Sequence, residues 1–129
     1  MNISAVARQT GLSAKTIRFY EAQGVISEPG RSDNGYRVYS ERHLSQLAFI
    51  KRARDLGFSL LECSELLALS NDPGRRSADV KRKFAEKLHW IDQEIKRMEA
   101  ARQFIEELEG CCPGDDQPDC PIIDRLQQG

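Results

Sequence analysis

The feature that most restricts the fold of this chain is a segment from Ser77 to Glu109 that contains neither glycine nor proline. Apolar residues recur in it at alternating steps of four and three, the spacing of one face of a helix. They are Phe84, Leu88, Ile91, Ile95, Met98 and Ile105, and Arg102 is the one polar residue that interrupts the pattern. At a rise of about 1.5 Å per residue, such a helix would be about 45 to 50 Å long, more than a small domain covers by itself.

This long helix therefore needs a partner along its apolar face. It could pack back along its own domain, or it could form a parallel or antiparallel coiled coil with a second chain. Because the apolar pattern extends over four heptads, we favour the coiled coil.

The whole chain has 129 residues, of which 40% are hydrophobic, 30% charged and 7% aromatic. This composition suits one small soluble domain, or one domain with an appended helix. No apolar run approaches the roughly 20 residues needed to cross a bilayer, and no hydrophobic region of the signal-peptide kind follows Met1. We therefore expect a cytoplasmic protein without a membrane partner.

The net charge of −1 hides an uneven distribution. Residues 1–60 carry nine Lys and Arg against five Asp and Glu, a net charge of +4, whereas residues 61–129 carry ten against fifteen, a net charge of −5. The two parts are expected to meet different partners. The near-neutral total argues against indiscriminate nucleic-acid binding, but it permits a local basic face.

The first part of the chain contains two short helical patterns joined by a glycine. The first covers Ser4 to Gln9 and is followed by Gly11, which tolerates the left-handed conformation of a helix C-cap. Ser13 then offers an N-cap hydroxyl for a second helix, which we expect to end near Gln23. Two short helices joined by a tight turn are typical of a helix-turn-helix.

A small β-hairpin is expected next. The pair Asn34-Gly35 lies between Arg31 and the stretch from Tyr36 to Tyr39, and an Asn-Gly pair supplies the positive φ angles of a type I′ turn. A hairpin that follows a helix-turn-helix directly would form a wing.

Two further helices are predicted after the hairpin. Ser40 is the expected N-cap of the first, which Gly57 closes. Ser59 and Glu62 then match the capping box, in which each side chain satisfies a backbone N–H of the other residue. The helix that they begin is expected to run through Leu69 and to end before the turn at 71–74.

The second helix of a helix-turn-helix enters the major groove, where donors to base edges and to phosphates are needed. A single basic residue is more often only a solvated charge, but a set on two DNA-facing elements favours binding. The candidate contacts are Lys15, Thr16, Arg18 and Tyr20 on the exposed side of this helix, and Arg31, Tyr36 and Arg37 on the wing. Phe19, which lies close to Ile17, is assigned to the core instead.

Three of the four cysteines lie in the last nineteen residues, at positions 111, 112 and 120. Two thiolates brought together by the short loop between Cys112 and Cys120 suit a soft monovalent ion such as Cu(I), Ag(I) or Au(I). Tetrahedral zinc and iron–sulfur clusters normally need four ligands, and this segment has no histidine. A disulfide or two idle thiols are the alternatives, and spacing alone favours metal only slightly. Cys63 has the spacing of a core residue.

The segment from Ile17 to Glu21 with Gly24, and the segment from Arg31 to Tyr39, closely resemble the signature of the MerR family of transcription regulators, and Leu56 to Leu60 continues the likeness. The resemblance implies a mostly α fold with an antiparallel dimerisation helix. Its parts would be a winged helix-turn-helix with connector helices at residues 1–70, a hinge turn at 71–76, the dimerisation helix at 77–109, and a metal-binding loop with a C-terminal tail at 110–129.

The same resemblance implies a function. The protein would be a homodimer that binds double-stranded promoter DNA and, when its effector binds, distorts the DNA so that RNA polymerase can initiate. Bending or untwisting a site stores a few kcal/mol, which an effector can supply through its differential affinity for two states. An enzyme is not expected, because no nucleophile elbow, phosphate loop or catalytic His/Glu metal spacing occurs.

The two cysteine segments, Cys112 to Asp116 and Asp119 to Ile123, resemble the metal-binding loop of the copper-efflux branch of this family, in which two cysteines hold Cu(I). Within the family, sensors of divalent ions carry a cysteine at the start of the dimerisation helix and sensors of monovalent ions carry a serine. Ser77 occupies that position here, and it is the expected selectivity residue. Cys111 is one thiol more than a two-coordinate site requires.

Two other functions stay open at this point. One is a DNA-binding regulator that is switched by a disulfide between Cys112 and Cys120. The other is a zinc-dependent enzyme or a zinc-binding dimeric interaction module without DNA function, which would leave the basic residues of the first part unexplained.

Overall fold

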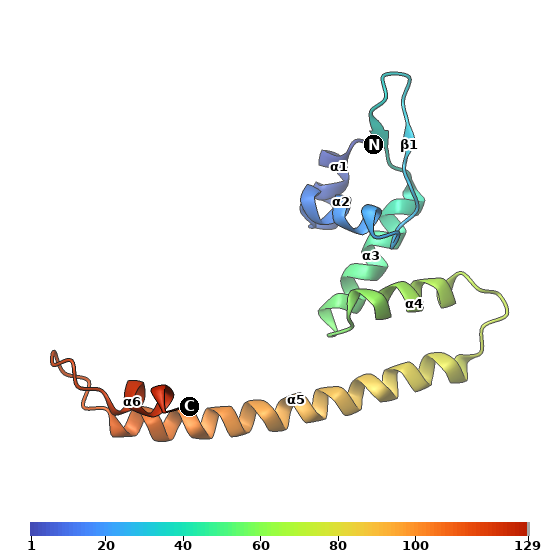
Figure 1. Ribbon diagram of the computed structural model, residues 1–129. Coiled ribbons are helices and arrows are strands. Elements are labelled where there is room, and N and C mark those ends of the chain that lie inside the picture. The colour runs from blue at the N-terminus through green and yellow to red at the C-terminus, as the bar shows by residue number, and fades with distance from the viewer. Residues whose placement is uncertain (129) are drawn as a thin grey trace. The chain divides into compact units, whose positions relative to one another are not determined.

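The computed structural model describes residues 1–128, and most of them are helical (Figure 1). Two compact units divide the chain, one formed by Met1–Lys83 and the other beginning at Phe84. The elements are α1 (Ile3–Thr10), α2 (Ala14–Ala22), β1 (Gly30–Arg31), β2 (Arg37–Val38), α3 (Glu41–Asp55), α4 (Leu60–Ser70), α5 (Ser77–Cys111) and α6 (Pro121–Gln127). None of the described helices is both long enough and apolar enough to span a bilayer.

Helices α1 and α2 form the predicted helix-turn-helix. The Asn2 side chain accepts a hydrogen bond from the Ala5 N–H at 2.9 Å and begins α1. Gly11 ends α1 with a φ of 75°, a conformation that strains any residue with a Cβ atom. The Ser13 hydroxyl accepts from the Thr16 N–H at 3.1 Å and begins α2. Local capping chemistry therefore fixes the angle at which α2 leaves the turn.

The wing is the antiparallel pair of β1 and β2, in which Arg31 lies opposite Arg37. Its turn is not the predicted type I′, because among the described residues only glycines have a positive φ. The Gly35 N–H donates to the Ser32 carbonyl at 2.8 Å, and the Ser32 N–H donates to the Tyr36 carbonyl at 2.9 Å. With a φ of 82° at Gly35, this is a three-residue loop in which a type I turn is followed by a glycine bulge.

The helices α3 and α4 begin at the predicted serines. The Ser59 N–H donates to the Glu62 carboxylate at 2.8 Å and the Ser59 hydroxyl accepts from the Glu62 N–H, so the predicted capping box is confirmed. At the start of α3, the Ser40 N–H donates to Nδ1 of the buried His43 at 3.0 Å.

The core of the first unit lies between α1, α2, α3 and α4. Two of the assignments on α2 are reversed: Tyr20 is only 8% exposed, whereas Phe19 is 52% exposed. Tyr20 follows Ile17 by three residues and lies on the same buried side of α2. Tyr20 is therefore part of the core, and Phe19 is exposed. Cys63 is fully buried, as expected. The core residues are Val6, Ile17, Tyr20, Val25, Ile26, Tyr39, Leu47, Ile50, Ala53, Phe58, Cys63, Leu66 and Leu67.

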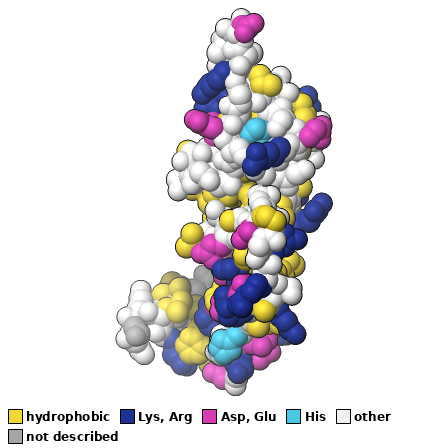
Figure 2. Space-filling model, turned by 90° about the vertical axis from the view of Figure 1, so that its right-hand side faces the viewer, with side chains coloured by type: hydrophobic (Ala, Val, Ile, Leu, Met, Phe, Trp, Pro, Cys, Tyr) yellow, Lys and Arg dark blue, Asp and Glu magenta, His cyan; other side chains and the backbone are white. Residues whose placement is uncertain are grey.

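The long helix α5 begins at Ser77 and continues through Gly110 to Cys111, so Gly110 lies inside the helix and does not end it. Hydrophobic side chains reach the surface of α5 among charged ones (Figure 2). The helix α6, which was not predicted from the sequence, lies against the end of α5 (Figure 1). There Leu108 is buried and the Arg125 guanidinium lies 5.3 Å from the centre of the Phe104 ring.

Candidate DNA-binding surface and metal centre

The exposed face of α2 combines two cations with two apolar groups. Lys15, Arg18, Phe19 and Ala22 are all exposed, and steps of three and four residues place them on one side of the helix. Thr16 is half-buried, and its hydroxyl accepts a hydrogen bond from Ser13 at 2.9 Å. Tyr20 does not belong to this face, because its ring packs in the core.

Glu21, which was not among the predicted site residues, connects the wing to α2. One oxygen of its carboxylate pairs with the Arg37 guanidinium at 3.1 Å, and the other accepts a hydrogen bond from the Tyr39 hydroxyl at 3.1 Å. The hydrogen bond and the charge of Glu21 raise the pKa of Arg37. Burial, followed by the hydrogen bond to Glu21, raises the pKa of Tyr39. In the sequence, the only signal for this role of Glu21 is that a carboxylate lies close to the predicted basic contacts of α2.

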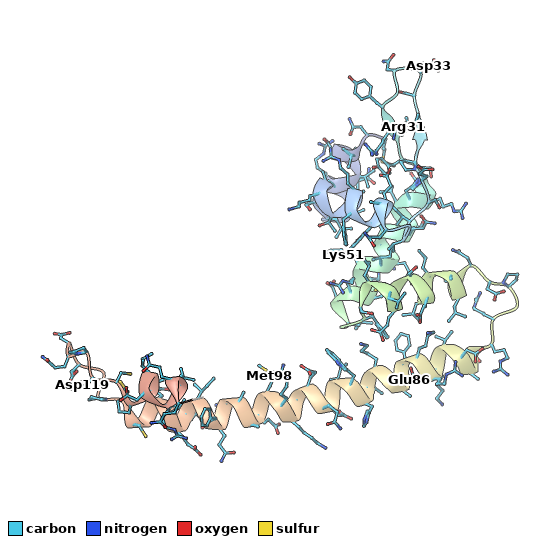
Figure 3. All side chains as sticks on the ribbon, in the orientation of Figure 1. Arg31, Asp33, Lys51, Glu86, Met98 and Asp119 are labelled. Atoms are coloured by element: carbon cyan, nitrogen blue, oxygen red, sulfur yellow. The ribbon has the colours of Figure 1, made fainter. Side chains whose placement is uncertain are left out.

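A groove of about 420 Å³ lies between the helix-turn-helix and the wing. It is lined by Asn2, Ile3, Arg18, Arg31, Gly35, Tyr36 and Arg37. Arg31 donates to the Gly35 carbonyl at 3.1 Å and so supports the wing turn, and Asp33 lies at the tip of the wing (Figure 3). Three guanidinium groups in one groove provide donors for phosphate oxygens, which accept bidentate hydrogen bonds from arginine.

The other candidate site lies after the end of α5. The sulfur atoms of Cys112 and Cys120 are 3.6 Å apart, and both side chains are half-buried, while the neighbouring Cys111 is exposed. A disulfide would require a separation of about 2.05 Å, so the two thiols are free. Two metal–thiolate bonds of about 2.3 Å each can span at most about 4.6 Å. The observed separation therefore lets one ion bind to both sulfurs.

The second thiol of this pair is poised for deprotonation. Cys120 precedes Pro121, the first residue of α6, and the backbone N–H groups at the start of α6 face its sulfur. The Cys120 side chain does not make an N-cap hydrogen bond with α6. The N–H of Ile123 is the largest cause that lowers the pKa of Cys120, and the thiol of Cys112 is the next. Because the thiolate is the form that binds metal, this favours binding of a soft cation.

Among the residues that the structure describes, no third ligand is grouped with this pair. In the part of the chain that the structure describes, no three His, Cys, Asp or Glu side chains are grouped so that they could hold a metal ion. His43 hydrogen-bonds through both ring nitrogens, to Ser40 and to the Ser27 carbonyl, and His89 is an exposed residue of α5. Ser77 is exposed at the first position of α5, at the end opposite to Cys111.

Comparisons with known proteins identify the family. Residues 1–70 match the MerR HTH family regulatory protein model, and residues 44–108 match the model described as MerR, DNA binding. The chain is 51% identical over 126 residues to the HTH-type transcriptional regulator CueR of Salmonella typhimurium, which covers 98% of this chain and 91% of that protein. It is 45% identical to the regulator HmrR of Rhizobium leguminosarum, over 100% of this chain and 99% of that protein.

Solved structures agree with this assignment. The transcription regulator PbrR691 of Ralstonia metallidurans, in complex with lead(II), has a TM-score of 0.81 and 28% identity, and the match covers 98% of each chain. MerR of Bacillus megaterium, in complex with mercury(II), has a TM-score of 0.65 and 30% identity, and the match covers 94% of each chain. The predicted mostly helical, winged helix-turn-helix fold is thereby confirmed. The chain belongs to the MerR family of DNA-binding transcription regulators, in its metal-responsive CueR-type branch, and it is not an enzyme.

Proposed function

We propose that this protein is a Cu(I)-responsive regulator that binds promoter DNA as a homodimer and activates the transcription of metal-efflux genes. Metal binding changes the distortion of the promoter, so that RNA polymerase in the cytoplasm can initiate. Ag(I) and Au(I) are chemically similar effectors that the same site would accept. This finer function rests on the likeness of the cysteine loop to the copper-efflux branch and on the geometry of the two thiols.

The observation that carries the proposal is the pair of sulfurs at 3.6 Å without a third ligand among the described residues. Cu(I) and the other soft monovalent ions prefer thiolates and accept few ligands, whereas structural zinc takes four. Cys112 and Cys120 would hold the ion, and their two negative charges would exceed the charge of a monovalent cation by one. The N–H groups at the start of α6, which face Cys120, offset part of that excess.

The homodimer is supported by the exposed apolar face of α5. Leu88, Ile95, Met98 and Ile105 on this face are all at least half exposed, and an apolar stripe of this length is typical of a coiled coil. Ser77 and the cysteine loop lie at opposite ends of α5. They can meet only when two chains pair in antiparallel order, which is how Ser77 of one chain would reach the site of the other and act on selectivity.

The DNA-binding part of the proposal is carried by the exposed face of α2 and the groove that leads to the wing. Lys15 and Arg18 are exposed and would reach the major groove, and Arg31, Tyr36 and Arg37 line the groove beside the wing and would contact the phosphates. Thr16 can contribute only through its partly exposed side chain. An Arg18→Ala variant that bound promoter DNA as well as the parent would remove the basis of this assignment.

The metal part is tested by titrating the reduced protein under anaerobic conditions with Cu(I) in competition with a Cu(I) chelator of known affinity. The parent and Cys111→Ser are expected to bind one Cu(I) per chain, whereas Cys112→Ser and Cys120→Ser lose this binding. Failure of the parent to compete with the chelator would contradict the proposal.

A second candidate, regulation by a thiol–disulfide switch, is favoured by the same 3.6 Å separation, because a small movement would join the sulfurs. Under this alternative, a mild oxidant activates transcription from the promoter in the absence of metal. Under the proposal, the oxidised protein neither binds Cu(I) nor activates.

A further inference from the structure

We infer that Phe19 is a specificity-determining residue that contacts the methyl groups of thymines in the major groove. This rests on the proposed DNA-binding function of α2 and adds the chemical feature that the helix reads. Two of the other exposed side chains on this face, Lys15 and Arg18, are donors that suit guanine and phosphate. Phe19 cannot donate hydrogen bonds through its side chain, so it would recognise DNA by apolar contact.

The first support is the position of the ring. Phe19 is 52% exposed, although Ile17 and Tyr20 on the same helix are buried in the core. Its ring centre lies 6.4 Å from that of Tyr20 at an interplanar angle of 51°, so the two rings are neighbours while half of the Phe19 surface is exposed. Single exposed apolar residues are common on proteins. This one, however, lies on the DNA-facing side of a recognition helix.

The second support is the set of neighbours. Phe19 follows Lys15 by four residues and precedes Ala22 by three, so all three share one face with Arg18. Cations on this face draw the helix into the groove, and the phenyl ring and the Ala22 methyl group then form an apolar patch between them. Nothing but hydrogen-bonding base edges and the thymine C5-methyl is presented in the major groove, and only the methyl group gains from contact with such a patch.

Replacement of a thymine with uracil removes only this methyl group, which makes the contact measurable. The preferred site is first selected from a random-sequence duplex library with the full-length chain. Each thymine of that site is then replaced with uracil, one position at a time, and the affinities of the parent, Phe19→Ala and Phe19→Leu are measured by fluorescence anisotropy at one fixed salt concentration. Circular dichroism checks that the variants fold, as expected for a half-exposed side chain.

We expect uracil at one or more positions in each half-site to weaken binding of the parent by about fourfold, the value of one buried methyl group. The same replacement leaves the affinity of Phe19→Ala unchanged, and Phe19→Leu keeps part of the effect. The inference is overturned if Phe19→Ala retains the uracil sensitivity of the parent, or if no position of the site is sensitive in the parent. If the library yields no preferred sequence, the proposed DNA-binding function itself fails, which is a separate and earlier result.

Discussion

The Cys112 and Cys120 sulfurs lie 3.6 Å apart, brought together by a loop that folds back from the end of α5 to the start of α6. The loop does this with Gly114, whose φ of 64° requires a glycine, and with the prolines that flank it. The Cys120 thiol faces the backbone N–H groups at the start of α6. This arrangement leads to the first prediction.

The Cys120 thiol should ionise at a lower pH than an ordinary cysteine, because the Ile123 N–H and the Cys112 thiol lower its pKa. Alkylation of Cys120 by iodoacetamide in the metal-free protein is expected to reach half of its maximal rate at a lower pH than alkylation of free cysteine. The part of the pH dependence of metal binding that comes from Cys120 should accordingly lie at this lowered pKa. Cys112→Ala removes the thiol of Cys112, which is the second cause, and is expected to shift the midpoint of Cys120 alkylation to a higher pH. Peptide mass mapping follows the alkylation of Cys120 in the parent and in the variant. The same pH dependence in both proteins would refute the role assigned to Cys112.

Glu21→Ala should loosen the wing. The substitution takes the acceptor from the buried Tyr39 hydroxyl and the partner from Arg37, and a buried donor left without a partner costs about 1 to 3 kcal/mol. We expect the free energy of unfolding to fall by that amount, with weaker DNA binding as well. Urea denaturation and anisotropy measure the two effects. Glu28→Ala, which removes an exposed carboxylate, is the matched control, and equal losses in both variants would argue against a specific role of Glu21.

The wing turn provides a test of backbone geometry. Within the wing turn only Gly35 has a positive φ, at 82°, so Gly35→Ala should cost about 1 to 2 kcal/mol, whereas Asn34→Ala should be nearly neutral. A type I′ turn would make both positions sensitive. Because the strain is confined to the wing, we expect Gly35→Ala to reduce DNA binding. Comparable losses of stability in the two variants would contradict this turn and favour the type I′ geometry predicted from the sequence.

Much of this fold follows from local signals in the sequence. The caps at Ser13, Ser40 and Ser59 lie where hydroxyls follow turn residues, and the long apolar repeat predicts α5 from its first residue at Ser77. These features depend on neighbours within one helical turn, so they can be deduced without knowledge of the tertiary structure.

The wrong predictions on α2 and in the wing have tertiary causes. Phe19 and Tyr20 are adjacent aromatics, and only the packing of α2 against the rest of the core decides which of them is buried. The turn at Asn34 and Gly35 takes a three-residue form because the pairing of Arg31 with Arg37 sets the loop length. The helix α6 was missed because seven residues give too little periodicity, although Pro121 at its first turn was a usable signal.

The apolar face of α5 predicts the oligomeric state. Met98 is 59% exposed and lies near the middle of α5 (Figure 3). If two chains bury it, Met98→Lys should weaken the dimer at least about tenfold, because burial of a methionine contributes about 1.5 to 3 kcal/mol. Sedimentation velocity over a range of concentrations measures this. Gln93→Lys adds the same charge at an exposed position off the apolar stripe and should sediment like the parent; dissociation of both variants, or of neither, would contradict the assigned face.

The central claim is that Cys112 and Cys120 convert Cu(I) binding into transcription. Its most direct test is transcription in vitro from the protein's own promoter with purified RNA polymerase, comparing Cu(I) with Zn(II) under anaerobic conditions. We predict that Cu(I), and not Zn(II), activates the parent and Cys111→Ser, and that neither ion activates Cys112→Ser or Cys120→Ser. Activation of the parent by Zn(II) alone, or activation by Cu(I) that persists in both serine variants of the pair, would contradict the account.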